Sequence, residues 1–511
     1  MSHAEKEVLS CTNSNGHPTV PSKPSINTNP ASSGANGGSY NLQLRNLLPA
    51  KRLQMATSFV VGVDVGSRSA RAALVTLKGN LLRKAERPLE VREAKGEIFE
   101  QSGEQIWNAV CECVREVISS VSVDDIKGIG FDATCSLVIT DATGKPVSVS
   151  ADGDDRFNVI MWCDHRACVE AELINREDHQ VLCRVGGRIS PEMEPPKLLW
   201  LKRHMPQSFQ RMKHAFDLPD YLTYRATGSL SRSLCSLSCK WTYDPRNGWD
   251  KIFWTEIGLN EVADRPEVIG VWGPYEGAIL PQLYLAEAGQ SATGMLLDHL
   301  LSTHGHYQTA LVNSKRFGIH IVQYVTQILE NLASSKRCSV DELTKDLHIY
   351  PDFHGNRSPL ADSNMRGMVS GLQLSSSEDN LALLFLAGVQ ALAYQTKHII
   401  ERLEEKGHRI ESLLLCGGLV KNPLYVAAHA NVLQLPVLVP EENEAVLLGS
   451  AVLGACASGC FENLRESMRE MSGRATALWP NRALAQLHAK RYKAFLALLD
   501  CQVAIRNIME C

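Results

Sequence analysis

The chain has little of what marks a nucleic-acid-binding, membrane or zinc-ribbon protein. Its 52 basic and 56 acidic residues leave a net charge of −4, which gives no electrostatic reason to expect nucleic acid or an anionic membrane as a partner. No apolar run approaches the roughly 18 residues that a membrane helix needs. The 15 cysteines are irregularly spaced, without the repeated C-x-x-C arrangement of zinc sites. We therefore expect reduced structural thiols, a cytoplasmic location and small molecules as partners.

Residues 1–57 are rich in Ser, Asn, Pro and Gly and have few apolar side chains. Such a composition buries too little surface to offset the entropy of ordering the backbone. The start of the chain also lacks the basic and apolar regions of a secretion signal. This segment is predicted to be a disordered extension.

From Phe59 onward, strand patterns alternate with helix patterns, which is typical of an α/β protein. Val60–Val75 is predicted to form a hairpin, and Leu81–Val91 a third strand. A helix is expected over 101–121, because Ser102 with Gln105 makes a capping box ahead of an apolar stripe. Two further strands are expected at Ile126–Phe131 and Leu137–Thr140, the second followed by a turn at 141–144.

The second half of the chain repeats this alternation. Ser375 with Glu378 is expected to open a long apolar helix that ends near Gly407. A short buried strand is predicted at 413–416, and Asn422 should cap a further helix, with a proline in its first turn. Two α/β domains are therefore expected, with the boundary near 262–270.

The stretch FVVGVDVGSRSARAALV could bind phosphates. Gly62 and Gly66 let a backbone approach a ligand closely, and Ser67 and Ser69 add hydroxyls. Successive N–H groups in such a turn can hold phosphate oxygens, and Asp64 can hold Mg²⁺, usually through water. No P-loop or dinucleotide-binding glycine motif is present. A plain hairpin with a glycine-rich turn explains this stretch equally well.

A second candidate is LLLCGGLVKNP, where a predicted strand runs into Gly417 and Gly418 and then a capped helix. Paired glycines at such a junction leave room for a flat base and a ribose against the backbone. Ordinary strand-to-helix turn chemistry is an equally good explanation of this stretch taken alone.

Polar residues also follow two apolar runs, in IGFDATCSLV and VIMWCDHRA, where α/β folds gather ligands. Carboxylates, a guanidinium and an indole face suit a polyhydroxylated substrate. The candidates are Asp132, Thr134, Cys135, Trp162, Asp164, His165 and Arg166. The alternative is that Asp164 and Arg166 form a buried ion pair that serves the fold.

Two other polar clusters are assigned structural roles. The loop PDFHGNRSPLADSNMRG contains Asp352, His354, Arg357 and Arg366. Its turn-forming residues are accounted for by a defined loop conformation, so a structural role is preferred to a binding site. His304 and His306 are interpreted as satisfied or solvated side chains rather than as a metal site.

These motifs together resemble the FGGY carbohydrate kinases, over nearly all of 59–495. The match includes VGVDVGSRSARAALV, GFDATCS, MWCDHRA, PPKLLWLKRH, DLPDYLTYRATG, CKWTY, PDFHGNRSPL and CGGLVKNP, and GFDATCS is most similar to the D-ribulose kinase branch and the animal FGGY-domain proteins. The resemblance implies two actin-like (ribonuclease H-like) α/β domains, 58–264 and 265–495, with a cleft between them. It also implies ATP and Mg²⁺ as cofactors and transfer of the γ-phosphoryl to a ketopentose such as D-ribulose, giving D-ribulose 5-phosphate.

The resemblance assigns roles by motif. Those toward Mg²⁺ and phosphates fall on Asp64, Gly66, Ser67 and Ser69, with Asp64 as the metal ligand. Those toward adenosine fall on Gly417, Gly418 and Asn422. Those toward the sugar fall on Asp132, Thr134, Cys135, Trp162, Asp164 and Arg166. A small sugar is the expected partner, and a homodimer is left open.

One part of the family pattern is missing. The second domain of the family opens with strands leading to a G-x-x-D-x-x-A stretch, whose aspartate takes the proton from the attacking hydroxyl, and then a G-T-S hairpin. Neither motif is present in residues 254–294, where Asp264 lies in a predicted linker and Asp298 in a predicted helix. Loss of a general base typically costs 10²–10⁴-fold in rate, roughly 3 to 5 kcal/mol. The alternative to an active kinase is therefore a catalytically impaired splice-type product that binds sugar or nucleotide without turnover.

Overall fold

The computed structural model describes residues 58–510, except 95–96, 178, 186, 244–247, 264–274, 277–279, 281–283, 286–287, 361, 363, 406 and 443. All of these described residues fall in one compact unit. The expected disordered extension lies outside them, as do Asp264 and most of the expected domain boundary. No helix in the described part combines the length and apolarity needed to cross a bilayer.

The first sheet has the strand order β3-β2-β1-β6. It consists of β1 (Phe59–Val65), β2 (Ser69–Thr76), β3 (Leu81–Pro88) and β6 (Ile126–Ala133). β1, β2 and β3 pair antiparallel in sequence order, and β6 runs parallel to β1. β1 is apolar on both faces, as a central strand covered on both sides should be. The predicted hairpin and third strand are confirmed.

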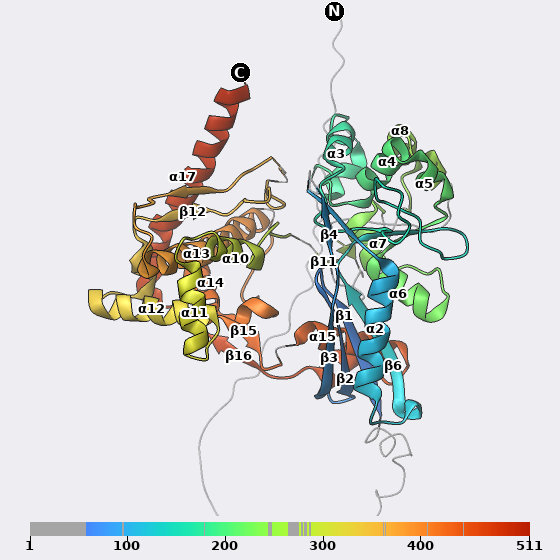
Figure 1. Cartoon of the computed structure of the whole chain (residues 1–511), viewed down its shortest axis with the longest axis horizontal. Coiled ribbons are helices and arrows are strands. Elements are labelled where there is room, and N and C mark those ends of the chain that lie inside the picture. Colours follow the sequence, from blue (N-terminus) through green and yellow to red (C-terminus); the bar gives the residue numbers. More distant parts are fainter. Residues whose placement is uncertain are drawn as a thin grey trace, which may run out of the picture. The chain divides into compact units, whose positions relative to one another are not determined.

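Helices cover both faces of this sheet (Figure 1). On one face lies α2 (Gly103–Ile118), whose N-cap Ser102 accepts a hydrogen bond from the Gln105 N–H. The predicted capping box is only half formed, because the Gln105 side chain accepts from the Glu90 N–H instead. On the other lies α15 (Ala445–Ala457), which packs against β1 and β6. A Cβ on Gly62 would lie 2.1 Å from the Leu447 carbonyl oxygen, and one on Gly130 would lie 1.9 Å from that of Ser450. Glycine at these two strand positions therefore allows the helix backbone to touch the sheet.

A second sheet has the order β4-β5-β8-β7-β9. Its strands are β4 (Arg92–Ala94), β5 (Ile98–Gln101), β8 (Val159–Ile160), β7 (Leu137–Thr140) and β9 (His214–Asp217). Short helices follow these strands: η2 (Val123–Asp125), α3 (Cys168–Asn175), η3 (Gln180–Val185), α4 (Glu194–His204), α5 (Pro206–Arg211), α6 (Leu218–Thr227), α7 (Leu234–Lys240), α8 (Lys251–Glu256) and α9 (Asn260–Ala263). The fully buried Trp241 and Trp254 pack in the core that these helices share with β7.

The second half of the chain is mainly helical around one apolar core. Its helices are α10 (Gly294–Ser302), α11 (Tyr307–Arg316), α12 (Ile321–Lys336), η4 (Val340–Thr344), α13 (Glu378–Glu404), η5 (Gly418–Lys421), α14 (Pro423–Leu433), α16 (Leu464–Met471), η6 (Arg482–Leu484) and α17 (Ala485–Glu510). Two strand pairs are short, β10 (Tyr275–Glu276) with β11 (Tyr284–Leu285) and β12 (His348–Tyr350) with β13 (Met368–Ser370). A third sheet joins β14 (Leu413–Leu414), β15 (Val437–Pro440) and β16 (Ala475–Leu478).

Two expected boundaries in this half were misplaced. A cap at Ser375 would start the long helix at residue 376, but the helix begins at Glu378, because its N-cap is Ser377, whose side chain accepts from the Asn380 N–H. Ser375 instead lies outside the helix, with its hydroxyl 3.0 Å from that of Ser377. The strand expected over 413–416 ends at Leu414 because the chain leaves β15 before Cys416. The capping of α14 by Asn422 is confirmed.

Candidate active site

Two carboxylates lie side by side at the ends of parallel strands. Asp64 on β1 is opposite Asp132 on β6 in one direction and opposite Arg71 on β2 in the other. The Arg71 Nη2 group forms an ion pair with Asp64 Oδ2. Burial raises the pKa of Asp64, against the opposing effect of Arg71, and the nearby Glu444 and Glu86 raise it further. The Asp132 side chain keeps an exposed surface, but partial desolvation by its surroundings and the Asp64 charge together raise its pKa to about 6.

This pair has the chemistry of a divalent-cation site. Two neighbouring carboxylates repel each other when both are ionised, and a bound cation removes that repulsion. Carboxylate oxygens are also the ligands that Mg²⁺ prefers. The residues present therefore fit Mg²⁺. Asp64 and Asp132 would hold the ion, and the ion would neutralise the charge of bound phosphates.

The turn after β1 is joined to the segment that contains Trp162. The Gly66 N–H donates to the Ser69 carbonyl over 2.9 Å and closes the turn. The Trp162 Nε1–H donates to Ser67 Oγ over 3.0 Å, and Gln101 Nε2 donates to the Ser67 carbonyl over 2.9 Å. Two residues predicted for different ligands, the phosphates and the sugar, are thus in direct contact. Because Ser67 accepts the indole bond, its hydroxyl proton remains available for donation.

The GFDATCS segment lies beside the same groups. The Thr134 N–H donates to the Val65 carbonyl over 3.0 Å. The hydroxyl of Ser136 accepts from the Trp162 N–H over 3.2 Å and lies 3.5 Å from the Thr134 hydroxyl. Thr134 and Cys135 are both partly buried. Of the predicted sugar-side residues, the structure therefore places Thr134 and Trp162 by the first turn, whereas Asp132 lies opposite Asp64.

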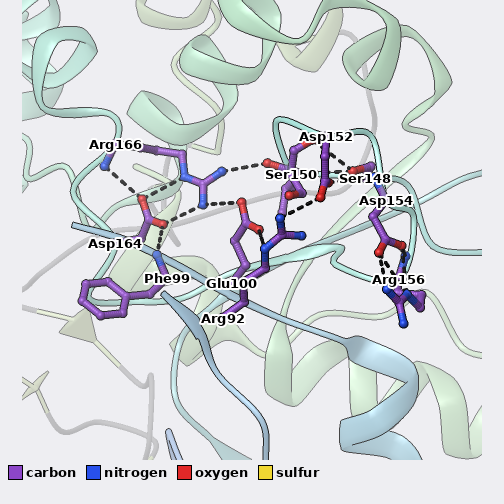
Figure 2. A network of polar contacts seen from close by, with 11 residues as sticks. Arg92, Phe99, Glu100, Ser148, Ser150, Asp152, Asp154, Arg156, Asp164 and Arg166 are labelled. Atoms are coloured by element: carbon purple, nitrogen blue, oxygen red, sulfur yellow. Dashed lines mark hydrogen bonds and ion pairs between the residues drawn. The ribbon is translucent and has the colours of Figure 1, made fainter. Parts of the chain in front are cut away.

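Asp164 and Arg166 instead form a buried ion pair (Figure 2). Asp164 accepts from the Phe99 N–H over 2.7 Å and from the Arg166 guanidinium at both of its oxygens. Arg166 also donates to the Val149 carbonyl and to Glu100 Oε1. Both oxygens of the carboxylate are therefore engaged within the fold. These contacts are the ones expected if Asp164 and Arg166 form a buried ion pair that serves the fold, which was the alternative to a sugar-binding role.

The predicted adenosine side borders a cavity of about 430 Å³. Gly418 and Asn422 line it, and a Cβ on Gly418 would meet nothing within 4 Å. Gly417, with φ of +88°, precedes this turn in a conformation that favours glycine. Apolar side chains from three elements complete the wall, namely Leu297, Phe385 and Leu419. Open backbone at one side and apolar walls at the other suit a flat base.

Sequence reasoning missed several residues of these sites. Glu192 is almost fully buried, and its pKa is lowered to about 2 because the imidazole of His165, Lys240 and Arg357 outweigh the effect of burial. Leu297 and His320 line the cavity beside Gly418. Their local sequence has no signal for this placement, since each lies in an ordinary helix or helix cap.

Comparisons with known proteins agree with this arrangement. The model of the N-terminal domain of the FGGY family of carbohydrate kinases matches residues 59–261, and that of the C-terminal domain matches residues 254–458. The chain belongs to the FGGY family of carbohydrate kinases. Members are phosphotransferases that use ATP as the phosphate donor.

Three relatives illustrate the match. An FGGY carbohydrate kinase domain-containing protein of Danio rerio is 41% identical, with 89% of this chain and 100% of the relative covered. A D-ribulokinase of Saccharomyces cerevisiae is 34% identical, with 82% of this chain and 74% of the relative covered. The crystal structure of a xylulose kinase from Lactobacillus acidophilus superposes with a TM-score of 0.67 at 16% identity, covering 88% of this chain and 99% of that one. The last comparison shows the actin-like fold of FGGY kinases.

The alignment with the zebrafish relative also shows that this chain has fewer residues within the aligned range. It extends over 545 positions, whereas 89% of this 511-residue chain is about 455 residues. About 90 positions of the relative therefore have no counterpart here. Apolar side chains are exposed along the third sheet, with 61% of Leu414, 40% of Leu478 and 70% of the following Trp479 accessible. By the strand register, Leu414 lies on the same face as Leu438 and Leu478 on the same face as Val437, so these exposed side chains are spread over both faces of the sheet.

Proposed function

We propose that this chain derives from an ATP-dependent ketopentose kinase that converts D-ribulose to D-ribulose 5-phosphate. The observation that carries the proposal is the 34% identity to a yeast D-ribulokinase over 82% of the chain. The grouping of the Ser67, Thr134 and Ser136 hydroxyls with Trp162 supports it, because hydroxyls beside an aromatic face suit a polyol.

In the proposed reaction, the sugar 5-hydroxyl oxygen forms a bond to the γ-phosphorus while the bond to the bridging β-phosphate oxygen breaks. ADP leaves, and the hydroxyl proton passes to a base. Gly417, Gly418 and Asn422 are assigned to adenosine, Gly66, Ser67 and Ser69 to the phosphates, and Asp64 with Asp132 to Mg²⁺. Catalysis of this kind depends mainly on positioning and on charge stabilisation.

The proposal includes a reduced rate for this particular chain. The missing stretch of about 90 positions is assigned to the entrance of the second domain, where the family places its catalytic aspartate and a phosphate-binding hairpin. Without the base, turnover is expected to fall by about 10²–10⁴-fold. Binding of nucleotide or sugar without turnover is the second candidate function, and the same gap favours it.

A sugar panel tests the assignment. ADP release is measured with purified chain, MgATP and either D-ribulose, D-xylulose, D-gluconate or glycerol, and sugar binding is measured separately by calorimetry. The proposal predicts that D-ribulose binds most tightly and gives the largest sugar-dependent ADP release, at a low rate. Preference for another sugar in both measurements would overturn the assignment of substrate.

A further inference from the structure

Three potential metal ligands meet away from Asp64 and Asp132. Glu97 lies in the turn between β4 and β5, His165 follows β8, and His354 lies in the loop after β12. One ligand atom from each lies within 4.8 Å of the others. Three segments that are distant in sequence thus bring a carboxylate and two imidazoles together.

Glu97 is held in an unfavourable backbone conformation by His165. Its φ is +60°, in the left-handed region that residues other than glycine rarely adopt. The His165 N–H donates to the Glu97 carbonyl over 3.1 Å, and His165 Nδ1 lies 2.8 Å from Glu97 Oε2. Backbone outliers of this kind persist where the surroundings over-determine them and are concentrated at functional sites.

His354 supplies a buried nitrogen that lacks a partner. Its ring stacks on that of His165, with centroids 4.5 Å apart and planes inclined by 18°. His354 Nε2 is buried, and no described residue offers it a hydrogen bond. A buried polar atom left unpaired is costly, so a water or an ion is expected beside it.

The surroundings favour a cation. The Glu192 carboxylate lies on the far side of His165, with its Oε1 4.0 Å from Nε2, and thus is placed to orient the ring as a second-shell carboxylate does in zinc sites. Two cations, Lys240 and Arg357, also lie beside Glu192, and Arg357 Nε is 3.8 Å from Glu192 Oε2. Two carboxylates therefore face the imidazoles from both sides.

We propose that Glu97, His165 and His354 bind one divalent transition-metal ion of the zinc type. Two imidazole nitrogens and one carboxylate oxygen match the donor set of three-ligand zinc sites, with water completing the tetrahedron. Ligand atoms around such an ion are roughly 3.4 Å apart for bonds of about 2.1 Å. The ring of His354 must therefore turn out of the stack so that its free nitrogen aims at the ion. The site is independent of the proposed kinase reaction and ties the 351–367 loop to the turn at Glu97.

The test uses the full-length chain without a histidine tag, stripped with chelator and titrated with ZnCl₂ by calorimetry, with Co²⁺ absorption as a second readout of tetrahedral ligation. We expect one ion per chain, at least tenfold weaker binding in Glu97→Gln and His354→Ala, and loss of the Co²⁺ bands in both. The exposed His408 gives the matched control, and His408→Ala should bind as the unmodified chain does.

Equal zinc affinity in all four proteins, or no stoichiometric binding to the unmodified chain, would overturn the proposal. Glu97 is more than half exposed, so Glu97→Gln remains informative if His354→Ala fails to fold. Because neither readout involves phosphoryl transfer, this result is separable from the outcome of the kinase assays.

Discussion

Arg166 Nη2 lies 2.7 Å from Asp164 Oδ2, and these two side chains are 2% and 0% exposed. The pair holds together the segments around Phe99, Val149 and Glu100. In this part of the MWCDHRA motif, two charged residues form part of the interior and support the groups beside them, of which Trp162 contacts the first turn.

Removing one charge of this pair is expected to be costly. Asp164→Asn leaves the buried guanidinium of Arg166 without its main counter-charge, so the free energy of unfolding should fall by about 3 to 5 kcal/mol. Urea unfolding followed by fluorescence measures this loss.

The same network provides a matched control. Arg92 and Asp152 form a 2.6 Å pair, but their side chains are 34% and 51% exposed. Asp152→Asn should leave the free energy of unfolding nearly unchanged, because solvent screens this exposed pair. Similar small losses in both variants would show that the buried pair does not have this structural role.

Asp220 is expected to make stability depend on pH. Burial and the nearby Asp217 raise its pKa to about 7 from 3.8. The folded state therefore holds a proton that the unfolded state releases, and stability falls as pH rises from about 4 to about 7. Asp220→Asn removes this penalty while an amide oxygen can still accept from the Ser233 N–H, now 2.8 Å from Asp220 Oδ1.

We expect Asp220→Asn to be more stable than the unmodified chain at pH 8, by about 4 kcal/mol at most, and to show little advantage at pH 4. The melting temperature of both proteins across this range measures the effect. The exposed Asp500 supplies the control Asp500→Asn, which should follow the unmodified chain at every pH. A constant offset between Asp220→Asn and the unmodified chain would contradict the assigned ionisation.

Gly418 tests the assignment of the cavity to adenosine. Because a Cβ there meets nothing within 4 Å, Gly418→Val should leave stability nearly unchanged while its side chain fills space intended for the nucleotide. MgADP affinity, measured by calorimetry, is expected to fall at least tenfold. Gly449 also has open space around it and is exposed on α15, so Gly449→Val should bind MgADP normally. Unchanged affinity in Gly418→Val would place the nucleotide elsewhere.

Local signals explain what the sequence could predict. The β1–β2 hairpin, the Ser102 cap of α2 and the Asn422 cap of α14 depend on residues within a few positions of each other. The family motifs likewise identified the neighbours of the first turn. Ser375 and Ser377 both precede α13, and sequence spacing alone did not show which of them is the N-cap.

Long-range contacts explain what could not be predicted. α15 packs against glycines of β1 and β6 that lie more than 300 positions away in the sequence. Neither segment carries a local sequence signal that identifies the other as its packing partner. The lowered pKa of Glu192 similarly depends on His165, Lys240 and Arg357, which belong to other segments of the chain. The stacking of His354 on His165 is of the same kind.

The most direct test compares turnover in two proteins. One is this chain, and the other has the positions of the zebrafish relative that lack a counterpart here inserted at the expected junction, 262–272. With D-ribulose and MgATP, we predict that the restored protein releases ADP at least about 10²-fold faster, because it regains the base and the second phosphate-binding hairpin. Equal rates in the two proteins would contradict the account.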